Sequence, residues 1–76
     1  MTALTPEACR AARALLGWGV RDLAREAGIS PNTVHLVEKG SPFRADTATK
    51  ITDALGRFNV EITNGDGTGA RLRSVS

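Results

Sequence analysis

The stretch VRDLAREAGISPNTVHLVEKG, residues 20–40, carries two helix patterns in close succession. In the first pattern the apolar residues Leu23, Ala24 and Ala27 repeat at helical spacing, which predicts an amphipathic helix with these side chains inward. Gly28 follows as the expected left-handed C-cap, a position that favours glycine because glycine lacks a Cβ. The connection to the next helix is therefore very short.

The second pattern opens with Ser30-Pro31, a hydroxyl N-cap followed by proline at the first helical position. Val34 and Val37 lie three residues apart and share a helix face, so we expect both to face the core. The rest of this helix, predicted over residues 31–39, is then turned toward solvent. Two short helices joined by a tight turn with glycine at its first position are typical of a helix-turn-helix.

Two further helices flank this pair. Thr5-Pro6 is another hydroxyl-proline start, and the helix that it opens is stopped by the GWG sequence at residues 17–19. A fourth helix is predicted from Ala45 or Asp46 to Gly56. We expect Cys9, inside the first helix, to be a small buried apolar residue.

The sequence changes character after residue 56. RFNVEIT alternates apolar and polar residues, NGDGTG is a turn cluster, and ARLRSV alternates again, less regularly. This order predicts a β-hairpin, with a flexible glycine-rich tail as the alternative. We therefore expect a helical domain over residues 1–56 and a C-terminal strand or hairpin element over residues 57–76.

Composition restricts the classes of function. A chain of 76 residues makes one small domain, near the lower limit of what folds unaided, so self-association would help. One cysteine and one histidine are too few for an internal disulfide or a zinc site, and no metal, cofactor or small-molecule ligand is indicated. A net charge of +2 permits nucleic acid as a partner without requiring it.

Other sequence signals point away from membranes and catalysis. No apolar run reaches the length of a membrane span and the N-terminus lacks a signal-peptide core, so we expect a cytoplasmic protein. There is no His/Cys/Asp grouping, and NGDGTG lacks the strand-to-helix context and the lysine of a phosphate loop. An enzyme is therefore not expected.

RALLGWGVRDLAREAGISPNTVHLVEKG, residues 13–40, resembles the Cro/C1-type (XRE-like) helix-turn-helix family. The resemblance is carried by L-G-W-x-x-x-D-L-A-x-x-A-G-I-S and T-V-x-x-V-E-x-G, and it extends over roughly residues 6–55. It implies a mainly α, four-helix, lambda-repressor-like DNA-binding domain followed by a short C-terminal strand or β-hairpin. It also implies a small bacterial or phage regulator of transcription, most simply a repressor.

The resemblance places a DNA-reading surface on the helix over residues 31–39. The residues at base-reading positions are Ser30, Pro31, Asn32, Thr33, His35 and Leu36. Asn32 can pair with adenine, and Leu36 or Pro31 can contact a thymine methyl group. Phosphate contacts are expected from Arg21, Lys39, Ser41 and Arg44, together with backbone N–H groups of the Gly40-Ser41 turn. His35 is equally consistent with a phosphate contact or an ordinary surface position.

The resemblance also implies an ion pair between Arg13 of the first helix and Glu38 of the third, since an arginine beside the core needs a partner. One departure concerns the start of the second helix. Gly19 and Val20 stand where family members often have Ser or Thr followed by Gln, which leaves at most backbone N–H groups for a phosphate there.

The apolar C-terminal strand would be an exposed edge unless another strand paired with it. We therefore predict a homodimer formed through the C-terminal region, with the dimerisation residues Phe58, Val60, Ile62 and Leu72. The alternative function is a protein-interaction module, an antitoxin-like subunit or co-regulator, that binds a partner protein through the same helix-turn-helix surface. Pro31, Val20 and Leu36 would suit such an apolar contact.

Overall fold

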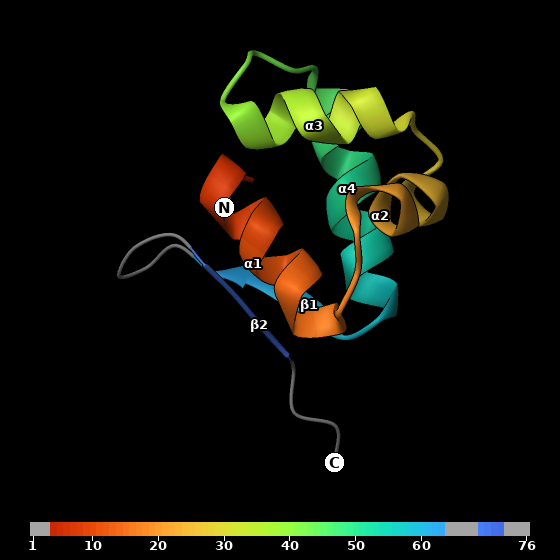
Figure 1. Cartoon of the computed structure of the whole chain (residues 1–76). Coiled ribbons are helices and arrows are strands. Elements are labelled where there is room, and N and C mark those ends of the chain that lie inside the picture. Colours follow the sequence, from red (N-terminus) through yellow and green to blue (C-terminus); the bar gives the residue numbers. More distant parts are fainter. Residues whose placement is uncertain (1–3, 64–68, 73–76) are drawn as a thin grey trace.

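The computed structural model describes residues 4–63 and 69–72, and it contains four helices followed by two strands (Figure 1). In chain order they are α1 (Pro6–Leu16), α2 (Val20–Ala27), α3 (Pro31–Lys39), α4 (Ala45–Arg57), β1 (Val60–Thr63) and β2 (Gly69–Leu72). β1 and β2 pair antiparallel. The predicted mainly helical fold with a C-terminal hairpin is therefore confirmed.

Hydroxyl side chains cap the starts of α1 and α3. The Thr5 hydroxyl accepts a hydrogen bond from the N–H of Ala8 at 3.1 Å and begins α1. The Ser30 hydroxyl accepts from the N–H of Thr33 at 3.1 Å and begins α3. Gly28 ends α2 with φ of 72°, in the left-handed region, and lets the chain turn directly into α3.

The end of α4 differs from the sequence prediction. The helix continues through Gly56 to Arg57, and the chain turns at Phe58 and Asn59, where Asn59 has φ of 64°. The Arg57 guanidinium donates to the backbone carbonyl of Glu26 at 2.6 Å, a tertiary contact that stabilises the last turn. The expected strand start at residue 57 is therefore wrong, and Phe58 belongs to the turn that precedes β1.

The core lies where all four helices and the hairpin meet. Its buried residues are Leu4, Cys9, Ala12, Leu23, Ala24, Val34, Val37, Ile51, Leu55 and Val60. Cys9 is fully buried, as expected. Val60 is only 2% exposed, so the apolar face of β1 completes the core of a single chain.

The hairpin packs against α1, which lies between the hairpin and α3 (Figure 1). In the hairpin register Val60 pairs with Leu72 and Ile62 pairs with Ala70. Of the predicted NGDGTG turn, residues 64–68 lie outside the described residues, as does the tail at residues 73–76, and Gly69 belongs to β2. Among the described helices, none has both the length and the apolar character needed to cross a membrane.

Candidate nucleic-acid interface

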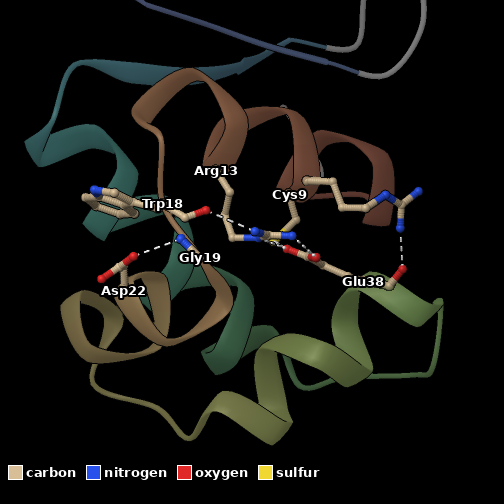
Figure 2. A network of polar contacts seen from close by, with 7 residues as sticks. Cys9, Arg13, Trp18, Gly19, Asp22 and Glu38 are labelled. Carbon is tan, nitrogen blue, oxygen red and sulfur yellow. Dashed lines mark hydrogen bonds and ion pairs between the residues drawn. The ribbon is translucent and has the colours of Figure 1, made fainter.

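Glu38, in the last turn of α3, is the centre of a polar network that joins α3 to α1 (Figure 2). Its Oε2 accepts from Arg13 Nε at 2.7 Å and its Oε1 accepts from Arg13 Nη2 at 2.8 Å, which makes the ion pair bidentate. The Cys9 thiol donates to Oε2 at 3.2 Å. The structure thus brings Arg13 and Glu38 together, with their side chains 20% and 8% exposed.

Two further arginine contacts extend this network. Arg13 Nη1 donates to the backbone carbonyl of Trp18 at 3.0 Å, so one side chain holds both α3 and the loop before α2. Arg10 Nη1 donates to the backbone carbonyl of Glu38 at 2.5 Å, at the C-terminal end of α3. No such role was expected for Arg10 or Cys9, although their spacing from Arg13 along α1 puts them within one helical turn of it.

The network fixes the charge states of its members. Burial alone favours a neutral Glu38, but the hydrogen bonds from Arg13 and Cys9 hold the pKa of this carboxyl group below its usual range. The hydrogen bond to Glu38 raises the pKa of Arg13. Burial first, and then the bond to Glu38, raises the pKa of the Cys9 thiol, so Cys9 remains a protonated donor.

The outer face of α3 is the candidate interface. Val34 and Val37 are fully buried, which directs the opposite side of the helix to solvent. The exposed residues on that side are Pro31, Asn32, His35, Leu36 and Lys39. Leu36, with 38% of its surface exposed, is one of the large apolar residues left outside the core. This face therefore combines an amide, an imidazole and an apolar side chain at helical spacing.

The hydroxyls of Ser30 and Thr33 differ from the rest of the predicted base-reading set. Ser30 Oγ lies 2.8 Å from Thr33 Oγ1, in a hydrogen bond that either group can donate. The same Ser30 oxygen accepts from the backbone N–H of Thr33. Both hydroxyl oxygens thus take part in hydrogen bonds at the helix start, although the bond between them uses only one of the two O–H hydrogens.

Arg21, Lys39 and Arg44 are exposed cations around α2 and α3. Within residues 4–63 and 69–72 none of the three forms an ion pair, whereas Arg13 and four further basic residues do. Those four are Arg25, Lys50, Arg57 and Arg71, paired with Asp22, Asp46, Glu26 and Glu61. The unpaired cations remain available for an anionic partner.

The backbone N–H groups of the Gly40-Ser41 turn, which we expected to bind phosphate, already have acceptors within the chain. The N–H of Gly40 donates to the carbonyl of Val37 at 3.1 Å, and the N–H of Ser41 donates to the carbonyl of Leu36 at 3.1 Å. Both N–H groups close the C-terminal end of α3, as the left-handed conformation of Gly40 requires. They are not free to bind phosphate, and only the Ser41 hydroxyl could do so.

One backbone N–H group at the start of α2 also has an acceptor within the chain. The N–H of Gly19 donates to Asp22 Oδ2 at 2.8 Å (Figure 2). Arg25 Nη2 donates to Asp22 Oδ1 at 3.0 Å. These two bonds, the first above all, hold the pKa of Asp22 below its usual range, so its carboxylate stays charged. The N–H of Gly19 therefore has an internal acceptor.

The four residues predicted for dimerisation lie in different environments. Val60 is in the core and Ile62 is half-buried beside it. The Phe58 ring packs edge-on against Trp18, with ring centroids 4.8 Å apart, and remains 39% exposed. Leu72 is 53% exposed. Only Phe58 and Leu72 present substantial apolar surface to a second chain.

Comparison with known proteins agrees with this geometry. A family model described as helix-turn-helix matches residues 10–58. A protein of Archaeoglobus fulgidus, named as a candidate HTH-type transcriptional regulatory protein, is 38% identical over 58 residues, which are 76% of this chain. The matched region is 19% of that relative's length. With α2, the Gly28 turn and α3 arranged as described, the chain belongs to the Cro/C1-type helix-turn-helix family.

Proposed function

We propose that this protein is a sequence-specific regulator of transcription that binds double-stranded DNA with α3 in the major groove. The observation that carries the proposal is the outer face of α3, where side chains of the types that bind base edges are exposed to solvent. A recognition helix needs such a face toward the groove and a separate face toward its own domain. Occupancy of a promoter is enough to block transcription, so repression is the proposed mode of action.

The unpaired cations support the same function. Arg21, Lys39 and Arg44 have no acidic partner among the described residues. Arg21 lies in α2, Lys39 ends α3, and Arg44 directly precedes α4. Each contact between a cation and a phosphate releases counterions and steepens the salt dependence by about 0.9 in the log–log slope. Three contacts per chain would give a total slope of about 3, which is modest, so two chains on one site would bind much more tightly.

Fluorescence anisotropy with a labelled duplex, measured between about 50 and 200 mM NaCl, tests DNA binding. Lys39→Gln and Arg44→Gln should each lower the slope by about one. Lys50→Gln is the matched control, because Lys50 already pairs with Asp46 at 3.4 Å and should change the slope little. Affinity that does not depend on salt, or equal losses in all three variants, would contradict the proposal.

We also propose that the protein acts as a homodimer through the hairpin side. The two strands form a two-stranded sheet, and Leu72 and Phe58 lie exposed at or near it. Leu72→Asp should turn a dimer into a monomer in light scattering and leave the far-UV circular dichroism unchanged, because this side chain is outside the core. A wild-type protein that stays monomeric both free and on DNA would refute dimerisation.

A partner protein on α3 is the competing function, favoured by the apolar character of Pro31 and Leu36 on an exposed face. The salt titration distinguishes the two functions. A protein-interaction module would show no salt-dependent affinity for duplex DNA, and Asn32→Ala would bind random and selected duplexes like the wild type.

A further inference from the structure

The hydrogen bonds at the start of α3 reduce the number of side chains that can read bases. Ser30 and Thr33 bond to each other, and the Ser30 oxygen also caps the helix. Turning either hydroxyl toward a base would break a bond that the helix start uses. The candidates that remain on the first two turns are Pro31, Asn32, His35 and Leu36.

These remaining side chains are poorly suited to guanine. The commonest specific contact to guanine is a paired hydrogen bond from arginine or lysine to O6 and N7. The sequence from Ser30 to Leu36 contains neither residue. Lys39 lies in the last turn of α3, whereas recognition helices read bases mainly with their N-terminal residues. A neutral His35 offers a single N–H donor and cannot make the paired contact.

Asn32 and Leu36 suit an adenine–thymine pair instead. The Asn32 amide can donate to N7 and accept from N6 of adenine, and a leucine can pack on the methyl group of thymine. The two residues are four positions apart and both exposed, so they project from the same face about 6 Å apart along the helix axis. With base pairs spaced about 3.4 Å, this separation corresponds to about two base-pair steps.

Resting on the proposed function, we infer that α3 selects duplex DNA in which each half-site contains A·T pairs about two base-pair steps apart. Asn32 reads an adenine and Leu36 reads the C5-methyl group of a thymine in this arrangement. Ser30 and Thr33 hold the helix start and contribute little to the choice of base.

Selection from a random duplex library with the full chain gives the first test, and A·T pairs should be enriched within each half-site. Replacing the selected thymine by deoxyuridine then removes only the methyl group. The wild type should lose about fourfold in affinity, the factor expected for one buried methyl group. Leu36→Ala should bind the two duplexes equally. Leu15→Ala is the matched control, because Leu15 is 42% exposed on α1 and should keep the wild-type preference for thymine.

Asn32 is tested in the same way with 7-deazaadenine, which lacks the N7 acceptor. The wild type should bind this duplex several-fold more weakly, and Asn32→Ala should not distinguish it from adenine. Selected half-sites dominated by G·C pairs, or equal methyl sensitivity in Leu36→Ala and the wild type, would overturn the inference. Those results would leave salt-dependent DNA binding intact, whereas loss of that binding itself would refute the proposed function.

Discussion

Replacing Glu38 by leucine should destabilise the domain severely, because it leaves the Arg13 guanidinium beside the core without its carboxylate. The side chains of the pair are 20% and 8% exposed, so the cost lies between that of a surface pair and that of a fully buried one. We expect a loss of about 2–4 kcal/mol in the free energy of unfolding. A domain of this size has only about 4–11 kcal/mol in total, and the midpoint of thermal unfolding should fall by about 10–25 °C.

Thermal and urea unfolding followed by far-UV circular dichroism measure this loss. The variants are Glu38→Leu, Arg13→Met and the double variant. An apolar pair leaves no charge uncompensated, so the double variant should recover most of the stability that either single change removes. A single cost below about 0.5 kcal/mol, as for an exposed pair, or strictly additive losses would refute a role for this pair as the main link between α1 and α3.

Three other predictions follow from single residues. The lowered pKa of Glu38 stabilises the folded domain above the unfolded pKa of about 4.3, and this stability is lost as the pH falls below that value. Urea midpoints measured between pH 2 and 7 should therefore fall less steeply with acid in Glu38→Gln than in the wild type. Some dependence on pH should remain in this variant, because the pKa of Asp22 is also lowered. Gly28→Ala should lower the free energy of unfolding in urea by about 1–2 kcal/mol, because Gly28 has φ of 72°. Gly56→Ala should raise it by about 0.5–1 kcal/mol, because Gly56 lies inside α4 and the added methyl group has open space. Val60→Ala should cost about 2 kcal/mol in the same assay because Val60 is 2% exposed, and an unchanged midpoint would show that the hairpin does not contribute to the core.

Features set by neighbouring residues were predictable from the sequence. The starts of α1 and α3 depend on a hydroxyl and a proline within the same turn, and both helices begin as expected. The inward face of α3 follows from the spacing of Val34 and Val37 alone. The left-handed conformation of Gly28 likewise follows from the short connection between two helices.

Features set by distant residues were not predictable. Glycine often ends a helix, and we expected Gly56 to end α4. The helix continues to Arg57 because Arg57 donates to the carbonyl of Glu26 and Phe58 packs on Trp18. These contacts join parts of the chain about 30 or more residues apart, and no local pattern encodes them.

Of two further details of the candidate site, one depends on distant residues and the other on a local turn. The contact of Cys9 with Glu38 needs the packed geometry of α1 on α3. The loss of the Ser41 N–H as a phosphate donor could have been foreseen, because a left-handed Gly40 directs the next N–H back to the helix.

The side chains of α3 divide into a buried or ion-paired set and an exposed set. Val34, Val37 and Glu38 hold the helix on the domain, and each change among them should cost stability. Asn32 and Leu36 are exposed, and substitution of such positions usually changes stability by less than about 0.5 kcal/mol. The exposed set, which includes the base-reading residues that we propose, can therefore change while the fold is kept. Ser30 cannot join that set freely, because loss of its cap would cost about 1 kcal/mol in a domain with little stability to lose.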